Sequence, residues 1–188
     1  MEILLIWIWI NGKMIIANNM NQLKIQFLHE ELKRTCEWIK FADQKAAFIA
    51  LYYSVLIGFL VSKKDIIVND LKQLHLGQLF VLNSILFLLL VLLSLGIFYL
   101  FSCVFPQLKN HSNEKSLFYF GTVSKMKFLD FIKKIENLSE DETKEQIAEQ
   151  IYTTSIIADQ KMNNIQNSVR CLFASAFLIL IMYVYFNL

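Results

Sequence analysis

The sequence predicts an all-α membrane protein with three transmembrane helices and a cytosolic helical layer formed by extensions of the first and third spans. The main reason is three uncharged, largely apolar runs at residues 46–62, 79–104 and 171–187. The chain has only one proline and five glycines, so its helices should be long. No alternation of apolar and polar residues indicates a β-strand.

Length identifies the run 79–104 as a span, because its 26 residues would rise about 39 Å as a helix. The hydrocarbon core of a bilayer is only roughly 30 Å thick. The other two runs would rise about 24–26 Å, so either alone could be a buried core helix. Both are dense in large apolar side chains on every face, and Lys45, Lys63 and Lys64 bracket the first run. Such lysines can reach lipid headgroups, and we therefore expect three spans.

Residues 1–18 form an uncertain amino-terminal segment. Its apolar part, residues 3–10, is too short to span, and Glu2 stands where a signal peptide carries positive charge. Two interpretations stay open: an interfacial anchor, or an upstream extension with Met14 or Met20 as the true start. We assign the segment no function.

Residues 19–45 are predicted to form a cytosolic helix that continues into the first span. Its apolar residues recur in alternating steps of three and four, the spacing of one stripe on a helix. This stripe consists of Ile25, Leu28, Leu32, Thr35, Ile39, Ala42, Ala46 and Ile49. After the span, residues 63–78 are predicted to form an external loop.

The second connection, residues 105–170, is predicted to be a cytosolic helical region. Pro106 limits the second span, and polar residues 109–115 indicate a loop. Residues 117–121 join four large apolar side chains to a glycine, which suggests a hydrophobic plug, although the glycine could also let the backbone approach a ligand. A short helix follows, with one apolar face made of Phe128, Phe131, Ile135 and Leu138.

The last helix is predicted to run from about Glu142 to the carboxyl end, its final half in lipid. Ser139 and Glu142 have the spacing of a capping box. From there, one apolar stripe continues without a helix breaker. It consists of Ile147, Ile151, Thr154, Ala158, Met162, Ile165, Val169 and Leu172.

The tetrapeptide Ala-Asp-Gln-Lys occurs twice, at residues 42–45 and 158–161. If the two helices ran side by side, Asp43 could meet Lys161 and Lys45 could meet Asp159. The first copy adjoins its span, whereas nine residues, about 13 Å of helix, separate the second copy from its span. This difference argues against a simple alignment. Whether the two copies are functionally related stays open.

Charge distribution predicts the orientation of the chain. With three spans, fifteen of the 18 Lys and Arg residues lie on the side of the amino-terminal arm and the second connection, and three lie in the loop 63–78. The positive-inside rule therefore places the arm and the connection in the cytoplasm. Fourteen acidic residues nearly balance the charge there, so nucleic-acid binding is not expected and an anionic ligand would need a local pocket.

The sequence does not indicate an enzyme. His29, His75 and His111 have no partners at metal-ligand spacing, and no glycine-rich loop follows a strand. The three cysteines lie far apart and are predicted to be reduced. We expect no catalytic residue, metal site or cofactor.

Charged and aromatic residues next to the spans are the candidates for ligand binding or gating. Asp43 and Lys45 are two residues apart and do not face each other, so each needs another partner, which could be purely structural. Lys161 and Arg170 could bind an anion, or could snorkel and pack. Trp38 could stack on a base or simply pack in a core.

Three short motifs share an order and a relation to the spans. Trp-Ile-Lys-Phe-Ala-Asp-Gln-Lys-Ala at residues 38–46 precedes the first span, and Tyr119-Phe120-Gly121 lies in the second connection. The third motif precedes the last span and comprises Gln150, Ile151, Ser155, Ile157, Ala158 and Lys161. From about Leu32 to the carboxyl end, the chain resembles the transmembrane Pycsar effector family (PycTM).

The resemblance implies a membrane effector of a two-gene bacterial antiphage system, in the inner membrane. A partner pyrimidine nucleotide cyclase would make cyclic CMP or cyclic UMP, the effector would sense it as a homo-oligomer, and loss of membrane integrity would abort the infection. The motifs carry over Trp38, Asp43, Lys45, Phe120, Gly121, Ser155 and Lys161 as ligand-binding or gating positions. Asp159 and Arg170 join them from the tetrapeptide and the charge pattern.

Other functions stay open. The chain could be a membrane scaffold or a small transporter subunit, although its spans hold none of the charges that transporters commonly use. It could also be a related defence effector that answers a different nucleotide signal. The neighbouring reading frame would discriminate: a pyrimidine cyclase, an oligonucleotide synthase or neither.

Overall fold

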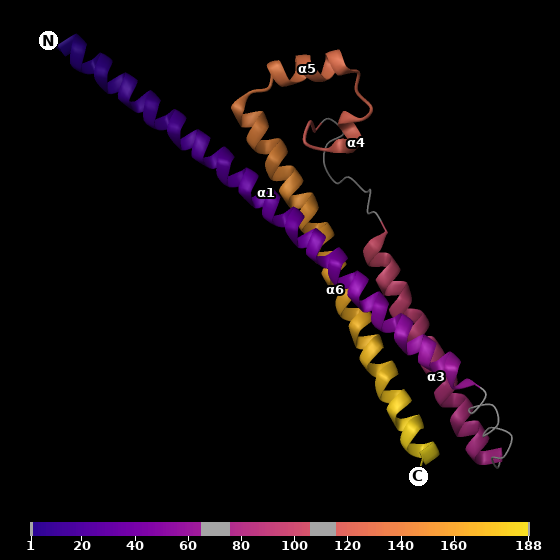
Figure 1. The fold of residues 1–188 in the computed structure, drawn as a ribbon. Coiled ribbons are helices and arrows are strands. Elements are labelled where there is room, and N and C mark those ends of the chain that lie inside the picture. Colours follow the sequence, from indigo (N-terminus) through magenta and orange to yellow (C-terminus); the bar gives the residue numbers. More distant parts are fainter. Residues whose placement is uncertain (1, 65–75, 106–115, 188) are drawn as a thin grey trace. The chain divides into compact units, whose positions relative to one another are not determined.

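The computed structural model describes residues 2–64, 76–105 and 116–187 (Figure 1). They form helices α1 (Glu2–Ser62), α3 (Leu76–Val104), α4 (Phe120–Val123), α5 (Phe128–Glu136) and α6 (Glu140–Asn187). No strand occurs among these described residues. Helices α1, α3 and α6 are long and apolar enough to cross a membrane, so the predicted all-α class with three spans is confirmed.

The chain divides into two units, which are described separately. The head unit comprises residues Met1–Trp38 and Leu108–Ala158, and the span unit comprises residues Ile39–Gln107 and Asp159–Leu188. Helices α1 and α6 each supply residues to both units.

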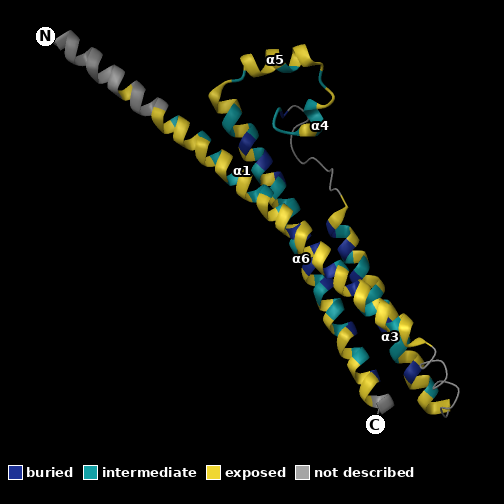
Figure 2. Cartoon of the chain, in the orientation of Figure 1, coloured by how far each residue is buried: buried dark blue, intermediate teal, exposed yellow. Residues whose placement is uncertain are grey.

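The span unit is a bundle of three helices in which α1 and α6 run parallel and α3 runs antiparallel to them (Figure 1). One core cluster joins all three helices and contains Ala42, Ala46, Ile49, Tyr53, Leu100, Cys103 and Ile165. A second cluster, made by Leu82, Leu89 and Met182, joins α3 to α6. The inward faces of the helices are thus buried while their outer faces are exposed (Figure 2).

The predicted apolar stripes are the buried faces of α1 and α6. All eight stripe residues of α1 are buried or half-buried, and so are all eight of α6. Helix α3 begins at Leu76, within residues 63–78, and ends two residues before Pro106. Most of the predicted loop 63–78 and the predicted loop 109–115 lie outside the described residues.

In the head unit, polar contacts join segments that are distant in sequence. The Lys144 ammonium donates to Oδ1 of Asn21 at 3.1 Å, which joins α6 to α1. The backbone N–H of Leu117 donates to Oε1 of Gln146 at 2.8 Å. The Phe118 ring lies 6.1 Å from the His29 ring, so part of the predicted plug does cover the helices.

One residue of the plug differs from the prediction. Phe120 is 69% exposed and does not cover a core. Gly121 lies inside helix α4. A side-chain carbon added at Gly121 would lie 2.6 Å from Cε1 of Tyr119, so the Tyr119 ring packs against this glycine.

Helix α6 starts with the predicted capping box, two residues earlier than Glu142. Oε2 of Glu142 accepts hydrogen bonds from the backbone N–H of Ser139 at 2.9 Å and from its hydroxyl at 2.8 Å. These bonds hold the pKa of Glu142 below its ordinary value. The neighbouring Asp141 also has a lowered pKa, because the Lys144 ammonium bonds to it at 2.9 Å.

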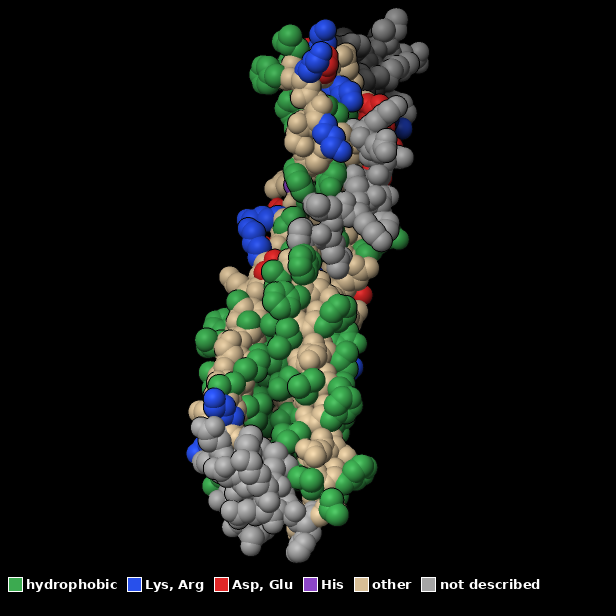
Figure 3. Space-filling view, turned by 90° about the vertical axis from the view of Figure 1, so that its right-hand side faces the viewer, with side chains coloured by type: hydrophobic (Ala, Val, Ile, Leu, Met, Phe, Trp, Pro, Cys, Tyr) green, Lys and Arg blue, Asp and Glu red, His purple; other side chains and the backbone are tan. Residues whose placement is uncertain are grey.

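Hydrophobic side chains gather on the face of the span unit shown in Figure 3. Many large apolar residues of the span unit are more than half exposed, among them Phe80, Phe87, Phe98, Phe173 and Phe177. A surface of this kind is unusual for a protein surrounded by water and suits a helix bundle in lipid.

Candidate functional site

An ion pair joins the two tetrapeptides. The Lys161 ammonium of α6 bonds to Oδ1 of Asp43 in α1, inside the span unit. The Lys161 side chain is only 8% exposed, whereas that of Asp43 is 47% exposed. This pair is one of the two contacts that a side-by-side alignment of the tetrapeptides predicted. The unequal distances to the spans were taken as evidence against that alignment, and for Asp43 and Lys161 this inference was wrong.

Small side chains make room for the pair. Ala42 and Ala46 flank Asp43 on α1 and are almost completely buried, which lets α6 approach closely. Cys103 of α3 is completely buried next to the pair, so all three helices meet here. A buried ammonium needs an anion nearby, and Asp43 supplies it.

The other predicted pair is absent from the span unit as described. The Lys45 ammonium lies 4.3 Å from the centroid of the Phe41 ring, one turn earlier on its own helix. Asp159 instead accepts a hydrogen bond from Nδ2 of Asn163 at 3.1 Å. Both residues are exposed. Each tetrapeptide therefore contributes one charged residue to the ion pair and leaves its other charged residue at the surface.

A chain of hydrogen bonds continues below the ion pair. The Tyr53 hydroxyl of α1 donates to the backbone carbonyl of Ser168 in α6 at 2.7 Å. The Ser168 hydroxyl in turn donates to the backbone carbonyl of Gly96 in α3 at 2.9 Å. These bonds satisfy buried polar groups. They also fix the positions of the three helices relative to one another along the bundle axis.

The helices approach each other closely at Gly96. A side-chain carbon added there would overlap the Tyr53 hydroxyl and lie 2.7 Å from its Cζ and 3.0 Å from Cβ of Cys171. Sequence reasoning missed Tyr53, Ser168 and Gly96. A glycine inside a long Leu-rich span was the available signal, since glycine in membrane helices commonly marks close approach.

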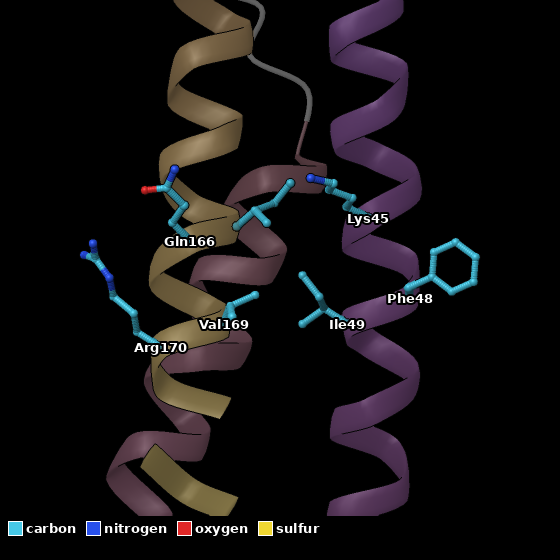
Figure 4. Close-up of a pocket in the computed structure, with 7 residues that line it drawn as sticks. Lys45, Phe48, Ile49, Gln166, Val169 and Arg170 are labelled. Carbon is cyan, nitrogen blue, oxygen red and sulfur yellow. The ribbon is translucent and has the colours of Figure 1, made fainter. Parts of the chain in front are cut away.

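An open groove of about 550 Å³ lies between α1 and α6. It is lined by Lys45, Phe48, Ile49, Ile165, Gln166, Val169 and Arg170. Figure 4 shows Lys45, Ile49 and Val169 pointing into the gap between the helices, while Arg170 points away from α1. The groove thus has one cation that points inward, Lys45, above apolar side chains. The Arg170 guanidinium bonds instead to Oδ1 of Asn167 at 3.3 Å.

The remaining predicted residues lie in the head unit. Trp38 is half-exposed on α1, and Ser155 is exposed on α6. Phe120 and Gly121 lie in α4, as described above. In the described part of the chain, no group of three or more His, Cys, Asp or Glu residues is placed to hold a metal ion.

Comparisons with known proteins show which sequences this chain is similar to. A sequence model of PycTM, described as the Pycsar effector protein domain, matches residues 27–187. The Pycsar effector protein SaPycTM of Staphylococcus aureus is 28% identical over 130 residues, which are 69% of this chain and 75% of that protein. No solved structure matches the chain significantly.

Proposed function

This chain belongs to the Pycsar effector family, and from that membership we propose how it acts. It is an antiphage defence effector, and its three long apolar helices give it a membrane location. It senses a cyclic pyrimidine nucleotide, cyclic CMP or cyclic UMP, which a partner cyclase makes on infection. The response is loss of inner-membrane integrity and abortive infection.

The ion pair between Asp43 and Lys161 is the observation that best supports a gating role. It lies at the start of the first span and joins the two helices that also supply residues to the head unit. A charge-assisted bond of this kind has two discrete states, formed and broken. A ligand that binds one state more tightly shifts the equilibrium by that difference in affinity.

The ligand's phosphate provides a physical route to that shift. An anion near Lys161 would compete with Asp43 for the ammonium, and Lys45 is a second cation that points into the adjacent groove. The apolar floor of the groove, formed by Ile49 and Val169, could hold a base or an acyl chain. The head unit, with most of the polar residues, faces the cytoplasm in this proposal, where the nucleotide is made.

Depolarisation of reconstituted vesicles tests the proposal. The purified chain is inserted into vesicles with an imposed membrane potential, and cyclic CMP, cyclic UMP or cyclic AMP is added. We expect one of the two pyrimidine nucleotides to collapse the potential and cyclic AMP to leave it unchanged. A potential that survives both pyrimidine nucleotides contradicts the proposed signal.

Charge reversal tests the residues. Lys161→Glu and Lys45→Glu should each abolish toxicity in cells that carry the active cyclase, while membrane insertion stays normal. Lys33→Glu is the matched control, because it makes the same charge reversal at an exposed position of α1 that is not among the candidate residues. Full toxicity in both Lys161→Glu and Lys45→Glu would remove these lysines from the site.

Family membership favours the effector over a scaffold or transporter subunit. An effector that answers a different nucleotide signal is distinguished by the same vesicle assay, with other cyclic nucleotides and oligonucleotides added. The identity of the enzyme encoded next to the effector gives an independent answer.

A further inference from the structure

The groove between α1 and α6 is lined by two cations and by no acidic residue of the described chain. Lys45 points into it, and Arg170 lines it from α6 with its guanidinium turned away from α1 (Figure 4). Lys45 contacts an aromatic ring, and Arg170 bonds to a neutral amide. The carboxylate of Asp43 already bonds to Lys161. The groove is therefore complementary in charge to an anion.

Both cations lie at the ends of apolar runs. Lys45 is the last charged residue before residues 46–62, and Arg170 is the last before residues 171–187. In a bilayer, the ends of such runs lie near the polar headgroups, and long basic side chains extend to them. Lys45 and Arg170 can therefore reach the phosphates of the surrounding lipids.

The floor of the groove is apolar. Ile49, Ile165 and Val169 line it between the helices, and Phe48 lines its α1 side. Its volume of about 550 Å³ lies within the range of roughly 300–1,000 Å³ that is typical of small-molecule sites. Water is unfavourable against such a floor, whereas acyl chains are the apolar material that surrounds a membrane helix. The groove thus suits an amphiphile with an anionic head.

We propose that this groove binds one anionic phospholipid of the surrounding membrane. The phosphate accepts hydrogen bonds from the Lys45 ammonium and the Gln166 amide, and Arg170 reaches the headgroup from the outer side. One acyl chain runs along Ile49 and Val169. Basic pockets between membrane helices bind anionic headgroups by the same chemistry. A zwitterionic lipid offers the same chain, but its own ammonium group weakens its attraction to the two cations.

This inference goes beyond the proposed function and does not rest on it, because it requires only the span unit in a bilayer. It gives the groove an occupant before any messenger is made. A nucleotide phosphate that approaches Lys45 would then have to displace the lipid headgroup.

Photo-crosslinking with lipids tests the site. The full chain is placed in phosphatidylcholine vesicles that hold a trace of phosphatidylglycerol or phosphatidylcholine with a diazirine in one acyl chain. We expect the phosphatidylglycerol probe to label the groove residues Phe48, Ile49 and Val169 at least about fivefold more than the phosphatidylcholine probe does. Equal labelling by the two probes, no labelling of the groove, or labelling spread evenly to exposed residues such as Phe87 and Phe177 overturns the site.

Charge removal is a second test. Lys45→Gln and Arg170→Gln should each lower phosphatidylglycerol labelling of the groove about fivefold. Lys40→Gln is the matched control, because it removes the same charge at an exposed position of α1 outside the groove, and it should change the labelling less than about twofold. Equal losses in all three variants would show only a general attraction of anionic lipid, and full labelling in the first two would remove the cations from the site. Either result overturns the proposal.

The acyl chain is tested without a change of charge. Val169→Trp fills the floor of the groove and should abolish the phosphatidylglycerol labelling of Phe48 and Ile49. Val55→Trp makes the same substitution at an exposed position of α1 outside the groove and should leave that labelling unchanged. Labelling that persists in Val169→Trp contradicts a chain held in the groove.

The depolarisation assay separates this inference from the proposed function. Phosphatidylglycerol labelling of the groove without depolarisation by either pyrimidine nucleotide leaves the lipid site standing and contradicts the signal. Depolarisation without labelling of the groove does the reverse and leaves the groove cations to the nucleotide.

Discussion

The two Ala-Asp-Gln-Lys segments are identical in sequence and opposite in environment. In α1, the alanines at 42 and 46 face the core, and the charges lie on the two flanks of the helix. In α6, Lys161 faces the core, and Asp159 lies about 200° around the helix and points outward. Helical phase, rather than composition, therefore decides which charge of each segment joins the ion pair.

Replacing the buried pair's acid should have the largest effect. Asp43→Asn leaves the Lys161 ammonium in the core without an anion, and we expect a loss of about 2 kcal/mol in unfolding free energy. The value lies below the usual range for buried pairs because Asp43 is half-exposed. Equilibrium unfolding in mixed micelles measures it.

Asp159→Asn is the matched control, since it makes the same change in the other segment. Its expected effect is within about 0.5 kcal/mol, as for other exposed sites. Equal losses of unfolding free energy in the two variants would show that the two segments are equivalent. The ion pair would then not determine the stability of the span unit.

Two glycines allow the same kind of comparison in the helix packing below the ion pair. Gly96→Ala forces the Tyr53 ring away from α3 and should cost about 1.5 kcal/mol. Gly58→Ala should be neutral or slightly stabilising, because a side-chain carbon there meets nothing within 4 Å. Thermal unfolding of both variants in one detergent checks the difference, and a stable Gly96→Ala variant would contradict the close packing.

Removal of the buried base should have a smaller effect than removal of its acid. Lys161→Met fills the buried site with a side chain of similar shape and leaves Asp43 partly hydrated, so we expect a loss of about 1 kcal/mol. Lys45→Met is the control and should be within about 0.5 kcal/mol of the parent. A larger loss for Lys161→Met than for Asp43→Asn would reverse the assigned burial of the two charges.

Acidification should loosen the start of α6, and we expect this effect to be the smallest. The pKa of Glu142 is lowered in the folded chain, so its contribution is complete above its ordinary value of about 4.3 and disappears as the pH falls through the lowered value. Hydrogen exchange, corrected for intrinsic rates, should rise in the first turn of α6 over that window. Glu142→Gln should remove this dependence, and an unchanged pH profile in that variant would exclude the capping box as its cause.

The long elements were predictable because each depends on one repeating pattern. The stripe from Ile25 to Ile49 specified the buried face of α1, and the capping box at Ser139 specified the start of α6. The family resemblance is also confirmed, since the family model matches residues 27–187. The roles of the individual site residues remain predictions.

The position of one helix relative to another along the bundle axis was not predictable. Counting residues from each apolar run assumed that α1 and α6 enter lipid at the same level. The structure instead aligns them through contacts that no local pattern reports: the hydroxyls of Tyr53 and Ser168 and the absence of a side chain at Gly96. The ion pair between Asp43 and Lys161 follows from that alignment.

The stagger of the two apolar runs has a consequence for the surrounding bilayer. With Asp43 beside Lys161, the apolar run of α1 begins about 10 Å before that of α6 along the bundle. No flat leaflet of uniform thickness can match both ends. If the chain acts as proposed, short-chain and long-chain vesicles should therefore differ in leak at one fixed concentration of the cyclic nucleotide.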